Sequence, residues 1–414
     1  AGTASGFGAT GETSWDTTVK TTGTFTATAG VGYFLNTTGG TITVNLPVGA
    51  AGSSVAMADY AATWQTNNVT VAANGTEKIG GVDADITLST EGQSVTFVYI
   101  DGTQGWVNVI DSTSNVRGAT FITASGGNQS PACGLICGDY KTHIFTGPGN
   151  LVVSTAATAP ANNILDYLVV AGGGGTGGAA DQQGGGGAGG FRMSNGLSLP
   201  APLTSPLTSL TGLTATATTY PIVVGGGGAN GGGNSGNASS FSTIPSAGGG
   251  FGIHNTPGAA GSGGSGGGAT QPSNSAGAGD TPPTTPNQGF PGGSVPCRNS
   301  PQYGSGGGGG AAAAGGGGNP GAAGAGGAGS FIDDNFIGPT APSYGTPGPT
   351  SNTRYFAGGG GGGAEAGVGC NGGVGGGGKG TCNTGSVTNG TINTGGGAGS
   401  GNDSTPCGAL GGSG

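Results

Sequence analysis

The chain has 414 residues and 106 of them are glycine, so about a quarter of the sequence has no side chain to bury in a core. Only 6% of the residues are charged, and 17 acidic residues outnumber 8 basic ones, which argues against a nucleic-acid partner. This composition excludes an average globular protein, and the low density of charge argues against ordinary disorder.

The sequence offers little material for chemistry. It has only two histidines, His143 and His254, and its carboxylates are scattered. We therefore expect no enzymatic activity and no cofactor. No apolar run is long enough to cross a membrane, and the first residues lack the pattern of a signal peptide, so the sequence predicts a soluble chain.

The first third of the chain reads as a series of short strands. Polar and apolar residues alternate in "TITVNL", and "SSVAMAD", "NNVTVAA", "ADITLS" and "QSVTFVYI" follow with turn residues between them. This spacing predicts a β-sandwich or β-roll over residues 1–112, with Trp64 and Trp106 in its core or at its edge. Asp83 and Asp85 lack the further ligands of a calcium loop and are interpreted as a solvated turn.

Residues 57–109 show a specific order of motifs. Asp59 and Trp64 are followed by "TNNVTV", "ANG" and "VTFVYIDGTQGW". In this order the stretch resembles a β-module of tail-fibre and other appendage proteins of bacteriophages. The resemblance implies a structural role, and no binding residue is carried over from it.

Residues 113–140 are rich in Ser, Gly, Asn and Thr and predict a connector. They contain the first pair of an even set of cysteines, which could staple a chain that lacks an apolar core. We expect disulfides and an extracellular setting; free thiols and a metal site are the alternatives. The cysteines are Cys133, Cys137, Cys297, Cys370, Cys382 and Cys407.

Residues 141–170 are strand-like again. "THIFTGPGNLVVST" predicts a hairpin that turns at Gly147–Gly149, and "NILDYLVVA" predicts a further strand. Glycine clusters begin directly after that strand.

Residues 171–414 contain clusters such as "GGGGTGG", "GGGGAGG" and "GGGGANGGG" at an irregular period, which excludes collagen. A flexible linker is the plain alternative, but apolar and aromatic residues stand at the ends of the clusters. We therefore expect an array of polyglycine II helices, whose outward-facing N–H and C=O groups pair between neighbouring runs. The expected fold class is an all-β module followed by this array, with essentially no α-helix.

Two segments, 331–345 and 351–359, place aromatic and polar side chains between glycine runs. Such side chains on a rigid scaffold suit contacts with a sugar or a protein surface, and the alternative is that the aromatics cap the array against water. The candidate contact residues are Phe331, Asp333, Asp334, Asn335, Phe336, Tyr344, Arg354, Tyr355 and Phe356.

The entry into the array, "YLVVAGGGG" followed by "GGGGAGGFR", resembles a recurrent pattern of phage fibre proteins. The alternation of glycine blocks and loops is similar to the tail-fibre tip adhesins of T-even-type phages. These resemblances imply a virion-surface protein that attaches a phage to a host-cell glycan or outer-membrane protein. They also imply contacts with other virion proteins and a homotrimer. A filament without a receptor and an ice-binding polyglycine II protein are the alternatives.

Overall fold

The computed structural model describes residues 13–112, 121–129, 134–138, 140–157, 162–177, 183–194, 203–209, 211–254, 258–271, 275–295, 304–364, 371–381, 386–401 and 408–414. Its described residues are nearly all β or extended, and they contain one short α-helix, α1 (Asp334–Ile337). The chain divides into two compact units, unit 1 (Ala1–Gly118) and unit 2 (Ala119–Gly414). The expected fold class is confirmed.

Unit 1 consists of two β-sheets, and successive strands from β1 to β6 belong alternately to one sheet and to the other. One sheet has the order β1-β3-β5-β8-β9 and the other β2-β4-β6-β7. From β1 to β6 the neighbours within each sheet pair in parallel, and β7, β8 and β9 add in antiparallel fashion. The chain therefore winds as a roll from β1 to β6, and the antiparallel strands β7, β8 and β9 complete the two sheets. The elements are β1 (Ser14–Lys20), β2 (Gly23–Thr26), β3 (Val31–Leu35), η1 (Thr37–Gly39), β4 (Ile42–Asn45), β5 (Ser54–Asp59), β6 (Val69–Ala72), β7 (Ile86–Leu88), β8 (Ser94–Tyr99) and β9 (Trp106–Ser112).

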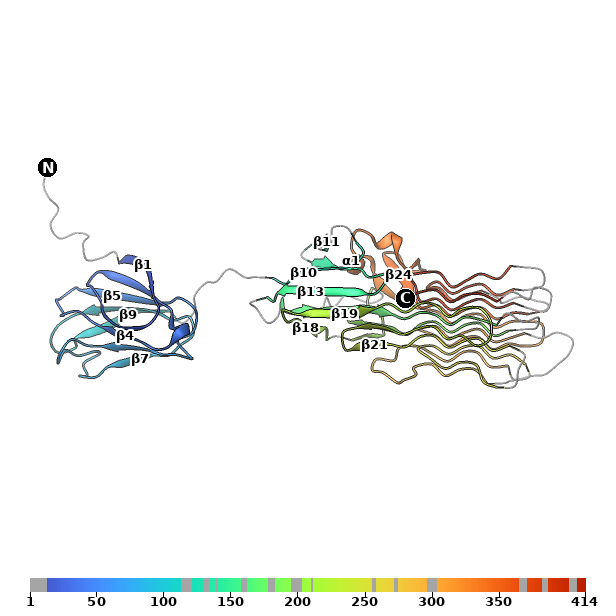
Figure 1. The fold of residues 1–414 in the computed structure, drawn as a ribbon, viewed down its shortest axis with the longest axis horizontal. Coiled ribbons are helices and arrows are strands. Elements are labelled where there is room, and N and C mark those ends of the chain that lie inside the picture. The colour runs from blue at the N-terminus through green and yellow to red at the C-terminus, as the bar shows by residue number, and fades with distance from the viewer. Residues whose placement is uncertain are drawn as a thin grey trace, which may run out of the picture. The chain divides into compact units, whose positions relative to one another are not determined.

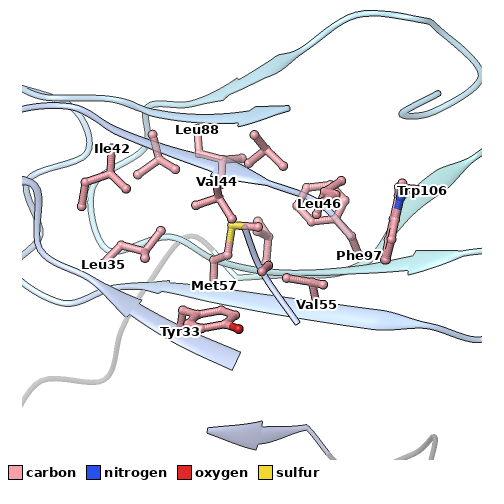
Figure 2. Packing of buried hydrophobic residues seen from close by; sticks show 14 of the residues in the cluster. Tyr33, Leu35, Ile42, Val44, Leu46, Val55, Met57, Leu88, Phe97 and Trp106 are labelled. Carbon is pink, nitrogen blue, oxygen red and sulfur yellow. The ribbon is translucent and has the colours of Figure 1, made fainter. Parts of the chain in front are cut away.

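The two sheets of unit 1 enclose one apolar core, because alternate residues of the strands point to the same side (Figure 2). Ile42, Val44 and Leu46, which alternate along β4 and just beyond it, have no exposed surface. Trp64 and Trp106 are also fully buried, as the sequence predicts. This core is of the ordinary kind, built from side chains.

A buried carboxylate fixes the loop that follows β5. Asp59 is 2% exposed. Its oxygens accept hydrogen bonds from the amides of Thr63 at 3.2 Å, Trp64 at 3.3 Å and Gly92 at 3.0 Å. The Trp64 indole in turn donates to the carbonyl of Leu35 at 3.4 Å. Asp59 and Trp64 therefore have structural roles.

Replacing Asp59→Ala should lower the free energy of unfolding of unit 1 by about 3 kcal/mol, because buried amides would lose their acceptor. All three tryptophans lie in unit 1, so tryptophan fluorescence during denaturant unfolding of the full chain reports on this unit. The exposed Asp85 is the matched control, and Asp85→Ala should change the stability by less than about 0.5 kcal/mol. Equal midpoints for the two variants would contradict this role of Asp59.

Unit 2 gathers its regular strands at one end of the glycine runs, which we call the base end; the opposite end is the far end (Figure 1). The sheets of the base end have the orders β10-β13-β19-β20-β21, β15-β16-β17, β22-β24-β23, β11-β12 and β14-β18. The strands are β10 (Thr123–Ser125), β11 (Leu135–Cys137), β12 (Tyr140–Thr142), β13 (Gly149–Thr155), β14 (Ile164–Leu165), β15 (Leu168–Val170), β16 (Phe191–Ser194), β17 (Thr208–Ser209), β18 (Leu213–Thr214), β19 (Thr219–Val223), β20 (Ser239–Phe241), β21 (Ile244–Ser246), β22 (Ser330–Asp333), β23 (Thr346–Pro347) and β24 (Thr353–Phe356).

The hairpin expected at Gly147–Gly149 is not formed. The strand before this turn, β12, pairs with β11, whereas β13 pairs with β10 and β19. The predicted strand after it is divided into β14 and β15. Partners from distant parts of the sequence thus override the local turn signal.

Successive amides of the run 183–190 donate to three different runs in rotation. Every third amide, beginning with Gly184, donates to the run 247–254. The amides one position later donate to 304–311, and those two positions later to 395–398, all at 2.8–3.0 Å. A rotation with three residues per turn is the geometry of a polyglycine II helix, so the expected array is present.

The carbonyls of the same run accept hydrogen bonds from three further runs, 171–177, 265–271 and 357–364. The run 183–190 therefore has six neighbours and lies inside the array. Its glycines are fully enclosed although no apolar side chain surrounds most of them. The interior of unit 2 is built from hydrogen-bonded backbone.

Glycine is required here because the runs approach too closely for a side chain. A Cβ atom added at Gly184 would lie 1.9 Å from the carbonyl oxygen of Gly268. One added at Gly186 would lie 2.2 Å from the carbonyl oxygen of Gly174. Both distances are far below van der Waals contact, so a methyl group would force the runs apart.

The last run, 408–414, lies beside runs from early and from late parts of the unit 2 sequence. The Gly411 amide donates to Gly228 at 2.9 Å, and the Gly412 carbonyl accepts from Gly173 at 2.9 Å. The Gly412 amide also donates to Gly396 at 2.8 Å. Segments more than two hundred residues apart are therefore direct neighbours in the array.

We expect Gly186→Ala to destabilise unit 2 by about 3 kcal/mol, because the added methyl group overpacks the array. Gly226→Ala is the matched control, since its Cβ would meet nothing closer than the Asn237 side-chain nitrogen at 3.7 Å. That control should shift the stability by less than about 1 kcal/mol. Amide hydrogen exchange over residues 183–190 would show the difference, and equal protection in both variants would contradict a close-packed array.

Candidate functional site

The two segments predicted to carry contact residues meet in a small three-stranded sheet, β22-β24-β23, at the base end (Figure 1). Phe331 on β22 pairs with Tyr355 on β24, and their ring centroids are 5.4 Å apart. The helix α1 and a 3-10 turn, η3 (Ala341–Ser343), connect β22 to β23. The structure therefore brings the nine predicted residues together within residues 330–356, which we call the cap.

Three of the nine residues are buried in this cap. Asp333, Tyr355 and Phe356 are 2%, 7% and 5% exposed. Phe356 belongs to an apolar cluster that joins the cap to the first strands of the array, and its other members are Ala188, Phe191, Met193, Ala311, Ile332, Ile337, Ala341 and Ala357. For these buried aromatics the packing favours the capping interpretation.

The polar residues of the cap hold its backbone. The Asp333 carboxylate accepts from the Asn335 amide at 2.8 Å and so caps the start of α1. The Arg354 guanidinium donates to the carbonyls of Tyr344 at 2.8 Å, Pro342 at 3.2 Å and Gly345 at 3.2 Å. Arg354 therefore fixes the loop before β23 and is already engaged in three hydrogen bonds.

The remaining surface of the cap is modest. Asn335 is exposed, whereas Phe331, Asp334, Phe336 and Tyr344 are half-buried. A contact role for these residues stays a prediction, with Asn335 as the side chain most open to a partner.

The far end is built from run ends and turns that the sequence did not single out. Two turns are described there, Gly231–Gly233 and Asn319–Ala322. Run ends are tied to one another by backbone bonds, for example from the Ala364 amide to Thr381 at 3.0 Å and from the Thr381 amide to Ser400 at 2.9 Å. The segments 178–182, 255–257, 272–274, 296–303, 365–370, 382–385 and 402–407 lie outside the described residues.

The cysteines can be placed only in part. Cys137 lies on β11 and forms no disulfide with any described residue. Cys133, Cys297, Cys370, Cys382 and Cys407 lie outside the described residues, so the disulfides stay a prediction.

A hollow of about 270 Å³ lies beside the far end. It is lined by Gly232, Gly233, Phe251, Gly252, Ile253, His254, Gly258 and Ala259. The sequence does not indicate this hollow, because its walls come from three segments and each segment by itself resembles part of a glycine run. The aromatic and the imidazole within "GGGFGIH" are the signal that could have drawn attention to it.

Other kinds of site find no support in the described part of the chain. No group of three or more His, Cys, Asp or Glu residues there could hold a metal ion. Among the same residues, no helix has the length and apolarity needed to cross a membrane.

The fold defines a class of protein in which a glycine-rich unit is held by backbone hydrogen bonds and capped by aromatic side chains at one end. A family model described as a glycine-rich domain matches residues 150–414, and the chain belongs to that family. No curated protein matches the chain.

If the cap stabilises the array, Phe356→Ala should lower the free energy of unfolding of unit 2 by about 3–5 kcal/mol, because it leaves a cavity in a buried cluster. Asn335→Ala on the same cap should have an effect below about 0.5 kcal/mol. Thermal unfolding followed by far-UV circular dichroism would compare the two. Unchanged unfolding of Phe356→Ala would argue against capping.

Proposed function

We propose that the protein is a virion-surface protein, a bacteriophage tail fibre, that attaches the particle to its host cell. The order of motifs in residues 57–109 and the entry into the glycine array, which resemble phage fibre proteins, support this proposal. So does the architecture, because a unit with few charges and a backbone interior is a stable extracellular scaffold. The proposed partners are a host-cell glycan or outer-membrane protein and other virion proteins, with the fibre acting as a homotrimer.

The observation that carries the proposal is the different use of side chains at the two ends of the array. At the base end, aromatic side chains are buried in clusters. At the far end, Asn319 and Pro320 are exposed at a turn. Since the runs bond through their backbones, turn residues at this end can change without altering the array. Loops of variable sequence on a rigid scaffold commonly carry recognition. We therefore place the contact surface at the far end.

Attachment can be tested with the labelled full chain on a panel of bacterial isolates. The chain should bind the cells that a phage carrying it infects, and it should compete with adsorption of that phage. Pro320→Arg should weaken binding by about tenfold or more, because it places a bulky charge in the contact surface. Asn335→Arg introduces the same charge at the base-end residue for which a contact role was also predicted; a contact surface at the far end predicts unchanged binding for this variant.

Two results would contradict parts of this proposal. Binding lost in Asn335→Arg and kept in Pro320→Arg would move the contact surface to the base-end cap. Absence of cell binding, with head-to-tail polymers or thermal hysteresis instead, would replace attachment by a filament or by ice binding.

A further inference from the structure

The hollow beside the far end has walls from three separate segments. Gly232 and Gly233 come from the turn between two runs, Phe251 and His254 from the end of the next run, and Ala259 from the chain that follows. The walls are tied together by the array, since the Gly231 amide donates to the Thr176 carbonyl at 3.0 Å and Thr176 pairs with Gly252. The hollow is therefore a preformed feature of the scaffold.

Its apolar wall contains the side chains of Phe251 and Ile253. Glycines keep the space beside the ring clear. A Cβ atom at Gly233, which lines the hollow, would contact the Phe251 ring at 3.5 Å and so occupy this space. A Cβ at Gly258 would meet the Ile253 side chain at 3.6 Å. The aromatic surface therefore remains available to a ligand that enters the hollow.

Its polar wall contains backbone amides that only this turn can present. Gly231, Gly232 and Gly233 have φ angles of +88°, +71° and +84°, a left-handed conformation that favours glycine. The Gly231 amide is bonded to Thr176, but the amides of Gly232 and Gly233 donate to no residue that the structure describes. The Asn234 side-chain amide bonds to the Gly231 carbonyl and closes the turn. Two donors thus stand at the rim beside the aromatic ring.

We infer that this hollow binds one uncharged sugar ring of a surface glycan, with its apolar face on Phe251 and its hydroxyl oxygens on the amides of Gly232 and Gly233. The inference rests on the proposed attachment function and names its ligand class. It also assigns a binding role to residues in the array itself.

Three properties of the hollow select this ligand class. Its volume of about 270 Å³ suits a single ring, since sites for larger, drug-sized ligands span about 300–1,000 Å³. The lining residues that the structure describes include no Asp, Glu, Lys or Arg, so none of them compensates a charged ligand. A purely apolar ligand would cover the two amides without pairing them, which costs about 1–3 kcal/mol for each group. A sugar offers both an apolar face and oxygen acceptors.

The test uses the full chain and the methyl glycosides of glucose, galactose, mannose and N-acetylglucosamine. Saturation-transfer NMR should detect binding of at least one glycoside. Ala259→Trp fills the hollow from an exposed position. It should weaken binding by about tenfold or more, whereas Asn150→Ala at an exposed position of β13 should not. Amide exchange over residues 183–190 would verify that the variants keep the array.

The inference is overturned if none of the four glycosides binds, or if Ala259→Trp binds as tightly as the unchanged chain. Failure of the wider function looks different. Cell attachment that Pro320→Arg removes, in a chain that binds no glycoside, would retain the attachment function and reject the sugar site. Glycoside binding that Ala259→Trp blocks, in a chain that binds no cells, would retain the sugar site and reject attachment.

Discussion

Hydrogen bonds between glycine backbones are the interaction on which unit 2 depends. Glycine loses more conformational freedom on folding than any other residue, and one hydrogen bond contributes only about 0.5–1.5 kcal/mol net. A pair of runs would therefore not be stable. The run 183–190 overcomes this limit because it donates to three neighbours and accepts from three others, so nearly every one of its peptide groups is bonded to a surrounding run. Close approach is the condition for this arrangement, and the absence of Cβ atoms provides it.

This use of the backbone leaves side chains free for other tasks. Unit 1 follows the usual solution, in which strands with one apolar face enclose a core around Val44 and Trp106. Unit 2 needs apolar side chains chiefly where the runs begin and end, and it places Phe191 and Phe356 together at the base end. At the far end, Asn319 and Pro320 of a described turn are exposed. The difference between the two ends is the physical basis for placing recognition at the far end.

Much of the fold could be predicted from the sequence, but partners in space could not. Alternation identified β4, β6, β7 and β8, because alternate residues of these strands are buried, and it also identified β5, which is buried on both faces. It did not indicate that β1, β3 and β5 pair in parallel, since both kinds of pairing have the same period. Glycine clusters indicated a polyglycine II array, yet identical residues carry no information about which run lies beside which.

The candidate site was limited in the same way. Aromatic residues in 331–359 were visible in the sequence, but the burial of Phe356 among partners from distant runs was not. The hollow near Phe251 depends on the turn at Gly232 and Gly233 meeting a run that follows it in the chain. Which segments lie side by side is determined by the hydrogen bonds of the whole array, and no short stretch of the sequence indicates it.

An interior made of peptide groups also changes how stability depends on temperature. Exposure of apolar surface raises the heat capacity of the unfolded state, by about 0.45 cal/mol/K for each Å², whereas exposure of polar surface lowers it by about 0.26. Unfolding of unit 2 exposes mainly backbone, so its heat-capacity change per residue is small compared with that of unit 1. Its stability curve is correspondingly flat, and the loss of apolar driving force that weakens ordinary cores in the cold has little to act on.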